Sequence, residues 1–586
     1  MRHALILLSI SATSLFLMSA TPLQSQTEDA QSIRMNQVGY FPNGPKRAIF
    51  SSIHKSDTQK HFRLIDATGK KEVFRGILTK PEYWKSADEW AAIADFSQFT
   101  QAGLYVIEVQ GGVLSAPFQI HNHIYEYALN ASVRTFYYQR ASISLDAKHA
   151  GPFSRKAGHL NKSIPYHKDL GKAQNARTAS PGGWYDAGDF GKYIVNAGVT
   201  TSLLLMTHER FGSIFPDGSL NLPESGNGTS DLLDEIRYEL EWFKTMQDAD
   251  GGVFFKVTPL KFAGKVMPAD DPSLQHMIGK STSSTLNFAA VMAYAARLYG
   301  DVDQSFAQQC LQQAEAAWQW ALKNTSIRYT QGTKSSNYKD VQTGGYGDQH
   351  FEDEFLWAKT ALFLATKDSK YSISIDDLPE KYSAPTWAQV SALALYSIIL
   401  NEESFAKKVS EKAKVMVQQA SVKILKEVMA HPYRINQMNY IWGSNIVPLN
   451  AILTLSFANH IEAHPVYLTT SVELMDYTFG KNPTGYSFVT GFGTKSPLHP
   501  HHRIMMADGI EPPIPGFLVG GPNRGRQDAN SLKRYGGYPS QAPAKSYRDH
   551  TASYASNEVA INWNASLVIA LSFLEHQRAL SIHEPK

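Results

Sequence analysis

Residues 182–193 read Gly-Gly-Trp-Tyr-Asp-Ala-Gly-Asp-Phe-Gly-Lys-Tyr, with two carboxylates three positions apart among four glycines. Glycine tolerates backbone conformations that other residues resist, so this composition predicts a tight loop. In such a loop Asp186 and Asp189 would point into one space, with aromatic walls from Trp184, Tyr185 and Tyr193. Two carboxylates in an aromatic-lined site suit proton abstraction from water or the binding of a metal ion. The alternative is an Asp-Gly turn that only joins two helices.

Length and composition set the protein's class. At 586 residues the chain exceeds one ordinary core, so we expect two domains. The hydrophobic content of 43% and charged content of 19% are typical of a globular protein. A net charge of +3, without a run of Lys or Arg, argues against nucleic acid as a partner.

The N-terminus has the pattern of an export signal. Arg2 and His3 precede an apolar run over residues 4–18, followed by small residues at 19–20. This run is too short for a spanning helix, so we assign residues 1–26 as a signal peptide; the alternative is a retained anchor. We therefore expect export to the periplasm or beyond the cell, with no membrane association after leader removal.

The residues after the leader have strand periodicity. Short β-forming runs, such as 46–50, 61–65 and 104–109, are separated by Gly- and Pro-containing turns. About seven such strands predict an immunoglobulin-like β-sandwich over residues 27–121. The chain has a single cysteine, Cys310, so the sandwich lacks the antibody-type disulfide, and we expect Cys310 to be a small core residue.

From Tyr125 onward the period becomes helical. In 230–247, for example, one face carries Leu232, Leu233, Ile236, Leu240 and Phe243. The pattern predicts helices at 125–140, 194–211, 230–247, 281–299, 305–323, 352–366, 384–400, 402–426, 446–461, 466–479 and 557–580. We expect them to pair and close into an all-α barrel over residues 122–586. The long loop 480–556 is predicted to build the rim of an active site.

Four segments resemble one known family. The Asp-Ala-Gly-Asp motif at 186–189 is similar to that of family 9 glycoside hydrolases, which are largely cellulases. Residues 487–503, with Ser-Phe-Val-Thr-Gly-Phe-Gly-Thr-Lys and then Pro-His-His-Arg, resemble the family's histidine signature. Residues 547–565 resemble its acidic signature, and 33–40 resemble the start of the immunoglobulin-like module that many members carry.

This resemblance implies an (α/α)6 barrel that hydrolyses β-1,4-glucosidic bonds with inversion. An inverting enzyme needs one acid to protonate the leaving oxygen and one carboxylate to activate water on the opposite face. By resemblance Glu558 is the acid, Asp189 is the base, and Asp186 helps to hold the water. Glu558 precedes the apolar run 559–561, and burial there would raise its pKa.

Further residues are candidates for binding sugar. His501 and Arg503 are expected to donate hydrogen bonds to sugar hydroxyls near the scissile bond. Trp563 stands where the family usually has an aromatic platform. Trp442 is either a second stacking surface or a core residue, and Tyr185 is expected to line the site from the glycine-rich loop.

Two kinds of metal site are considered. Asp348, Asp353 and Glu354 offer hard oxygen ligands and resemble a stretch where family members bind calcium; the alternative is a solvated, acidic helix start. The histidines at 499, 501 and 502 also suit a metal. The zinc of some relatives uses cysteines ahead of the Asp-Ala-Gly-Asp motif, which this chain lacks, so we expect no zinc.

Three functions remain open at this point. The first is an endo-β-1,4-glucanase acting as a monomer on β-1,4-linked polysaccharide or oligosaccharide. The second is an exo-acting β-glucosidase or exo-β-glucosaminidase, in which the insertion 141–181 would block one end of the cleft. The third is a non-catalytic carbohydrate-binding protein, against which the retained acid and base argue.

Overall fold

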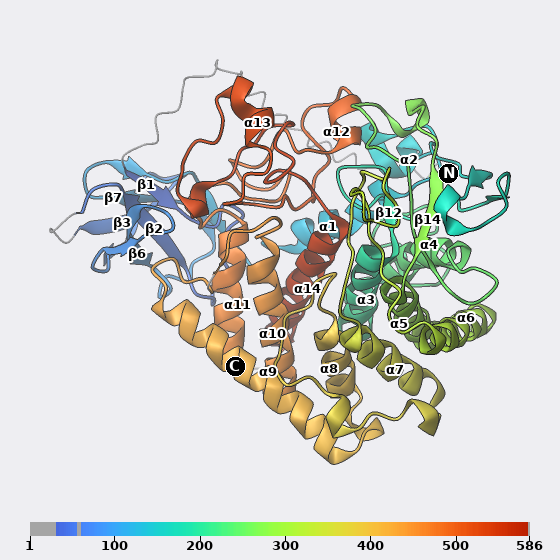
Figure 1. Ribbon diagram of the computed structural model, residues 1–586. Coiled ribbons are helices and arrows are strands. Elements are labelled where there is room, and N and C mark those ends of the chain that lie inside the picture. Colours follow the sequence, from blue (N-terminus) through green and yellow to red (C-terminus); the bar gives the residue numbers. More distant parts are fainter. Residues whose placement is uncertain (1–30, 56–59, 437, 584–586) are drawn as a thin grey trace, which may run out of the picture.

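The computed structural model describes residues 31–55, 60–436 and 438–583, in which a β-sandwich lies beside a large helical domain (Figure 1). The expected signal peptide lies outside the described residues. The sandwich ends with strand β9 (Phe118–Ile120), and the first barrel helix α1 begins at Glu126. The boundary drawn at 121/122 therefore falls in the connection between the two.

The sandwich consists of two antiparallel sheets. One has the strand order β1-β2-β6-β5, and the other has β4-β3-β7-β8 with β9 also paired to β7. Side chains of Phe62, Leu64 and Ile107 alternate inward and are buried between the sheets. The bounds are β1 Gln31–Arg34, β2 Arg47–Ser52, β3 His61–Asp66, β4 Glu72–Ile77, β5 Glu82–Trp84, β6 Glu89–Asp95, β7 Gly103–Val109, β8 Val113–Leu114 and β9 Phe118–Ile120.

The helical domain is an (α/α)6 barrel. Helices α3, α5, α8 and α10 are buried over most of their length and form part of the inner ring, whereas α4, α6 and α9 bury one face and lie outside it. The principal helices are α1 Glu126–Gln139, α3 Ile194–Phe211, α4 Asp231–Thr245, α5 Thr282–Tyr299, α6 Gln304–Lys323, α7 Glu352–Thr366, α8 Ser391–Leu400, α9 Lys407–Ala430, α10 Ile446–Ile461, α11 Pro465–Thr478 and α14 Ile561–His583.

Three predicted helix starts differ from the structure by more than one residue. The helix expected from 384 begins at Ser391, because Thr386 and Gln389 exchange backbone hydrogen bonds in a turn that precedes it. The helix expected from 402 begins at Lys407, after a short 3-10 turn. The helix expected from 557 begins at Ile561, because the preceding residues run extended and pair with other loops.

Irregular segments cover one end of the barrel. Residues 480–556 contain only the short helices α12 (Arg503–Ala507) and α13 (Ala529–Leu532) with 3-10 turns, and they lie above the helix ends in Figure 1. Residues 141–181 hold α2 (Ala147–Ala150) and the two-residue strands β10 (Ile164–Pro165) and β11 (Arg177–Thr178). A small antiparallel sheet, β12-β13-β14, adjoins the glycine-rich loop; its bounds are Lys192–Tyr193, Phe254–Thr258 and His276–Lys280.

The sandwich and the barrel share a core. The buried side chain of Asn36 donates hydrogen bonds of 2.8 Å to both the Tyr125 hydroxyl and Asp476 Oδ1. Arg47 on β2 pairs with Glu473 on α11. Ile49 of the sandwich belongs to the same hydrophobic cluster as the barrel helices. The two domains are therefore fixed to each other by continuous packing.

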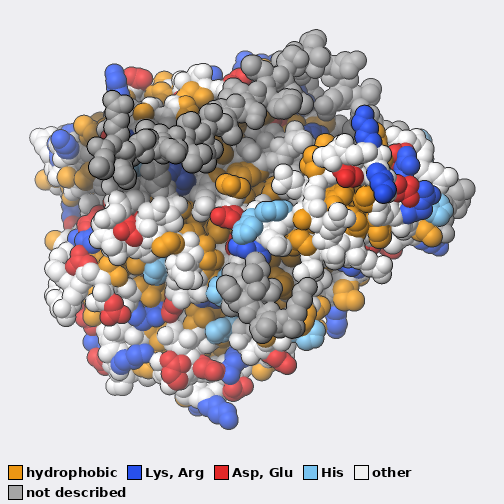
Figure 2. All heavy atoms as spheres, turned by 180° about the vertical axis from the view of Figure 1, so that it is seen from behind, with side chains coloured by type: hydrophobic (Ala, Val, Ile, Leu, Met, Phe, Trp, Pro, Cys, Tyr) orange, Lys and Arg blue, Asp and Glu red, His pale blue; other side chains and the backbone are white. Residues whose placement is uncertain are grey.

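Surface and hydropathy add two observations. On the face in Figure 2, positive and negative side chains are interspersed rather than gathered into a single-sign track. Across the described residues, no helix has both the length and the apolar character that crossing a membrane requires.

Candidate active site

The glycine-rich loop is fixed from below by buried charged groups. The Trp184 backbone N–H donates to Glu239 Oε2 at 2.6 Å, and Lys192 Nζ donates to the carbonyl oxygens of Ser180 and Gly182. Gly183 has φ +76°, and a Cβ there would lie 2.7 Å from the Trp242 ring. Only glycine combines this backbone conformation with so close an approach. The tight loop predicted from the sequence is confirmed.

Asp189 keeps one carboxylate oxygen free. Its Oδ2 accepts hydrogen bonds from the Tyr193 hydroxyl at 2.9 Å and from the Gly191 N–H at 3.1 Å. The Gly344 N–H donates to the Tyr193 oxygen at 3.0 Å, so the tyrosine proton is directed at Asp189. Oδ1 accepts no hydrogen bond from the described residues and can accept one from water.

Asp186 is tied down at both oxygens. Asn196 Nδ2 donates to Oδ1 at 2.6 Å, and the Tyr346 hydroxyl donates to Oδ2 at 2.7 Å. Burial, reinforced by the negative charge of Asp189, raises the pKa of Asp186 to about 7, and the two hydrogen bonds oppose that shift. Asp186 and Asp189 thus share one site with different surroundings: one carboxylate is saturated and the other is available.

Glu558 meets this loop from the far end of the chain. The segment before α14 forms bridges that pair Ala187 with Ala560 and His501 with Glu558. A Cβ on Gly188 would lie 2.1 Å from the His501 carbonyl oxygen and 3.2 Å from Glu558 Oε1, so glycine permits this contact. Burial and the negative charge of Asp189 raise the pKa of Glu558 well above its usual value, as the sequence predicted.

His501 and Arg503 lie at the same junction. His501 Nδ1 contacts the Thr551 carbonyl oxygen at 2.6 Å, and Nε2 has no partner among the described residues. Arg503 Nη1 donates to the Gly188 carbonyl oxygen at 2.8 Å and Nε donates to that of Ala263 at 2.9 Å. The guanidinium therefore holds the glycine-rich loop, and its second terminal nitrogen has no hydrogen-bond partner among the described residues.

Tyr185 lies behind the loop. It is 1% exposed, and its hydroxyl is 2.7 Å from His159 Nδ1, while His159 Nε2 is 3.0 Å from Asp271. Its ring packs with Phe190 and Ile504. The expected contact with sugar does not fit this placement, because burial leaves the ring no free face; Tyr185 supports the loop.

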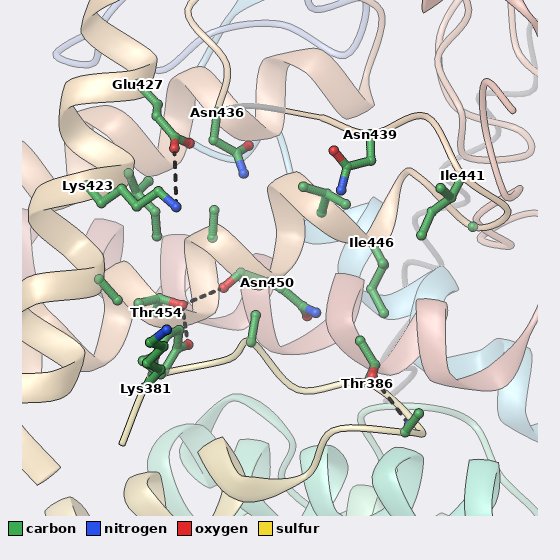
Figure 3. Close-up of a pocket in the computed structure, with 18 of the residues that line it drawn as sticks. Lys381, Thr386, Lys423, Glu427, Asn436, Asn439, Ile441, Ile446, Asn450 and Thr454 are labelled. Atoms are coloured by element: carbon green, nitrogen blue, oxygen red, sulfur yellow. Dashed lines mark hydrogen bonds and ion pairs between the residues drawn. The ribbon is translucent and has the colours of Figure 1, made fainter. Parts of the chain in front are cut away.

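A groove opens beside helices α9 and α10, and Asp186, Asp189 and Glu558 are not among the residues that line it. It has a volume of about 880 Å³, and its wall includes Trp387, Trp442 and Trp563. Trp442 is 39% exposed and its ring lies 5.6 Å from that of Tyr554. Trp387 contacts Tyr346 edge to face at 5.4 Å, which links the groove to Asp186. Figure 3 shows polar side chains from α9 and α10 around the rest of this space.

The suggested calcium ligands form a carboxylate-rich corner. Glu354 is 0% exposed and neither of its carboxylate oxygens has a hydrogen-bond partner; Asp348 Oδ2 is likewise buried without one. Burial, with the charges of Asp353 and Asp348, raises the pKa of Glu354 to about 11. Asp353 Oδ2 accepts from the Val390 N–H at 2.7 Å. Buried oxygens without partners suit a hard divalent cation, but the ligand atoms of Asp348, Asp353 and Glu354 do not all lie within 4.8 Å of one another, so binding one ion would require the three carboxyls to move closer together.

The histidines at 499, 501 and 502 do not converge on a common metal site in the described structure. His502 Nε2 is 2.9 Å from Gln139 Oε1, and His501 is bound to Thr551. Within the described ranges, one His/Asp group has atoms close enough to share an ion, consisting of His167, Asp169 and Asp340. His167 Nε2 is already 3.0 Å from Asp340 Oδ1, and Nδ1 accepts from the Asp169 N–H, so this group is self-satisfied.

Sequence reasoning missed several participants. Tyr346, Asn196 and Trp387 were not predicted as site residues, although Tyr346 lies two residues before the suggested calcium ligand Asp348. The position of Asn196, one helical turn after the glycine-rich loop, was the available signal. Tyr346 and Trp387 carry no comparable signal, because only the paths of their loops bring them to Asp186.

Comparisons with known proteins agree with this geometry. The model of glycosyl hydrolase family 9 matches residues 125–571, which is most of the chain. The chain belongs to glycosyl hydrolase family 9. A second model, the cellulase N-terminal ig-like domain, matches residues 28–113. The family 9 resemblance seen in the motifs is confirmed, and the protein is a glycoside hydrolase.

Family 9 members of known activity or structure resemble the whole chain. It is 37% identical over 576 residues to a xyloglucan-specific endo-β-1,4-glucanase of Bacteroides ovatus, covering 95% of each protein. It is 29% identical over 564 residues to endoglucanase D of Acetivibrio thermocellus, covering 94% of this chain and 85% of that one. A solved Bacteroides ovatus GH9 structure superposes with a TM-score of 0.84 at 36% identity, covering 93% of this chain and 99% of that one.

Proposed function

We propose that the protein is an inverting endo-β-1,4-glucanase in which Glu558 is the general acid and Asp189 the general base. One observation carries the proposal. The bridges between Ala187 and Ala560 and between His501 and Glu558 bring a carboxyl of raised pKa to the same junction as a carboxylate with a free oxygen. An inverting glycosidase requires such a pair, one protonated and one ionised.

The reaction follows from these environments. Glu558, protonated at neutral pH, donates its proton to the glycosidic oxygen as the bond to the anomeric carbon breaks. Asp189 Oδ1 takes a proton from a water that attacks that carbon from the opposite face. Asp186 is held by Asn196 and Tyr346, and its negative charge and fixed position orient that water.

The substrate would lie along the tryptophan-lined groove. Flat indole faces at Trp442 and Trp563 can bury the apolar faces of sugar rings. His501 Nδ1 donates to the Thr551 carbonyl oxygen, so Nε2 of the neutral ring can accept from a sugar hydroxyl beside the scissile bond, and the free terminal nitrogen of Arg503 can donate to one. One named relative is a xyloglucan-specific endo-β-1,4-glucanase and the other is an endoglucanase, so both linear and branched glucans are candidate substrates.

We also propose a structural calcium ion, held by Asp348, Asp353 and Glu354. A divalent cation would give the buried, unpartnered carboxylate oxygens of Glu354 a positively charged partner. These ligands follow directly after Tyr346 in the chain. The ion would therefore steady the loop that delivers the Tyr346 hydroxyl to Asp186.

For cellular location we propose export, directed by residues 1–26. The supporting pattern is the basic start, the short apolar run and the small residues that follow it. A polymeric β-glucan is too large to enter a cell, which fits an exported hydrolase. We also propose that the protein acts as a monomer. Mass spectrometry of the mature N-terminus tests the cleavage, and an intact residue 1 in the exported protein would refute it.

The deciding experiment compares viscosity with released sugar. Carboxymethylcellulose and xyloglucan are each incubated with the wild type, and viscosity and monosaccharide are followed together. An endo-acting enzyme lowers viscosity rapidly while releasing little monosaccharide. Monosaccharide release at nearly constant viscosity would favour the exo-acting alternative. Binding without hydrolysis on either polymer would favour the carbohydrate-binding alternative.

A further inference from the structure

A buried lysine lies beneath the proposed base. Lys256 is at the centre of β13 and is 0% exposed. In the antiparallel register it is the direct partner of Tyr193 on β12, the residue that donates to Asp189. Its Nζ lies 5.4 Å from the centre of the Tyr193 ring. In the described parts of the chain Lys256 forms no ion pair, so hydrogen bonds and more distant charges must stabilise it.

Hydrogen-bond accounting fixes the charge state of this lysine. Nζ contacts Gln331 Oε1 at 2.6 Å, Gly344 O at 2.8 Å and Thr343 Oγ1 at 3.0 Å. The amide and carbonyl oxygens can only accept. The Thr258 hydroxyl donates to Pro259 O, so in the 2.9 Å contact between Thr258 and Thr343 the Thr343 hydroxyl is the donor.

Thr343 Oγ1 must therefore accept from Lys256. Three acceptors require three N–H donors, which only the ammonium form supplies. A neutral amine would leave one of these buried oxygens facing a lone pair. The geometry thus describes a charged, fully buried lysine, although burial lowers its pKa.

A short chain of hydrogen bonds joins this ammonium to the base. Lys256 Nζ donates to the Gly344 carbonyl, the Gly344 N–H donates to the Tyr193 oxygen, and the Tyr193 hydroxyl donates to Asp189 Oδ2. Because Tyr193 already accepts from Gly344, its own proton is turned toward Asp189. A Cβ on Gly344 would lie 3.0 Å from the Tyr193 ring, which shows how closely the two segments pack.

Several titratable groups interact electrostatically with Asp189. Glu558 is protonated at neutral pH, and Tyr193 and Tyr346 are neutral hydroxyls, so Asp186 is the negative neighbour; His501 and Lys256 are the basic ones. A negative neighbour opposes ionisation of a base. Asp189 is in turn the acidic side chain whose charge opposes the effect of burial on Lys256.

We propose that Lys256 is a positioning residue for the base: its ammonium fixes Gly344 and Tyr193, and its positive charge keeps Asp189 ionised beside Asp186 and Glu558. This inference rests on the proposed function, since it assumes that Asp189 acts as the base. The proposal implies that Lys256 on β13 helps to set the pH below which the enzyme loses activity.

The test is the pH profile of kcat/KM for Lys256→Met, Lys256→Gln and Lys256→Arg on a cello-oligosaccharide. Removing a buried positive charge raises the pKa of the base, so the acidic limb should move to higher pH by about one unit in the Met and Gln variants. The Arg variant keeps the charge, and its acidic limb should stay near that of the wild type even if kcat falls. Circular dichroism confirms that each variant is folded.

Lys46→Met is the matched control. Lys46 is equally buried and its Nζ also donates to three oxygens, the carbonyls of Phe41, Pro42 and Gly44, but it lies in the sandwich. Its loss should lower stability without moving the acidic limb. Folded Lys256→Met and Lys256→Gln proteins whose acidic limb matches the wild type would overturn the proposal. A wild type that hydrolyses no β-1,4-glucan would count instead against the proposed function.

Discussion

At the scale of single residues, the surroundings of each carboxyl decide its role. Glu558 is desolvated and lies near the negative charge of Asp189, so its proton is retained to higher pH. Asp189 receives two hydrogen bonds on one oxygen, which stabilise its ionised form. The same carboxyl chemistry would thus supply both the proposed acid and the proposed base within one site.

The acid role of Glu558 can be separated from binding. Glu558→Gln should reduce hydrolysis of cello-oligosaccharides by about 10²–10⁴-fold. On a dinitrophenyl β-cellobioside, whose leaving group needs no proton, the loss should be much smaller. Above the raised pKa of Glu558 the acid is deprotonated, so wild-type activity falls as pH rises, and this basic limb should vanish in the variant with the activated substrate.

Asp189→Asn is the companion variant, because water activation is needed with either leaving group. It should lose activity on both substrates. Equal losses for Glu558→Gln on the two substrates would contradict the assignment of Glu558 as the acid.

The hydroxyl of Tyr346 has a measurable share in the site. Tyr346→Phe removes the 2.7 Å hydrogen bond to Asp186 Oδ2, which stabilises the ionised form of that carboxyl. A hydrogen bond to a charged group contributes about 1.5–3 kcal/mol, so kcat/KM should fall roughly 10- to 100-fold. Steady-state kinetics checks this, with Tyr299→Phe as the control, since that buried hydroxyl bonds only the Leu233 carbonyl. Similar kinetics for the two variants would exclude the role of Tyr346.

At the scale of elements, the loops place the side chains of the candidate site, and the helices support the loops. The loop 341–351 delivers Tyr346 to Asp186 and leads into the acidic start of α7 (Glu352–Thr366). Glu354 on that helix is buried with unpartnered oxygens, which the proposed cation would coordinate. Calcium at this corner would couple stability to the geometry of the site.

Chelation provides the test of that cation. Treatment with EDTA should lower the melting temperature and reduce kcat, and calcium should restore both, because binding to the folded state alone stabilises it. In the Glu354→Gln variant, adding calcium should leave the melting temperature nearly unchanged. Isothermal titration with calcium checks binding directly. No heat of binding and an unchanged melting temperature would show that no calcium site exists.

Sequence periodicity predicted most of the helices and strands but not the contacts between loops. The helix at 230–247 was predicted from one apolar face, and the structure has α4 at Asp231–Thr245. By contrast, Glu558 meets Asp189 through extended bridges between segments far apart in the chain, which no local pattern encodes. The motif resemblance supplied that pairing, whereas Tyr346 and Trp387 required the fold itself.

At the scale of the whole molecule, the sandwich acts as part of the barrel's core. Asn36 lies in the connection after β1 and bonds both Tyr125 and Asp476 across the domain interface. Ile49, from the sandwich, packs in the cluster that runs through the barrel. Because the packing is continuous, we expect the two domains to unfold together.

Calorimetry tests this cooperation. The wild type should unfold in one transition, and Asn36→Ala should lower its midpoint, at a cost of about 2–4 kcal/mol for the buried groups left unpaired. Asn337→Ala, at an exposed position, is the control and should change stability by less than about 0.5 kcal/mol. Two separate transitions in the wild type would show that the domains are independent.

The most direct test of the whole account is proton NMR of the first products from cellopentaose. If Glu558 and Asp189 act in a single displacement, the newly formed reducing ends appear first as the α-anomer, and mutarotation to the β-anomer follows. Cleavage should fall on internal bonds and give cellobiose and cellotriose before glucose. Initial accumulation of the β-anomer, or of glucose alone, would contradict an inverting endo-β-1,4-glucanase.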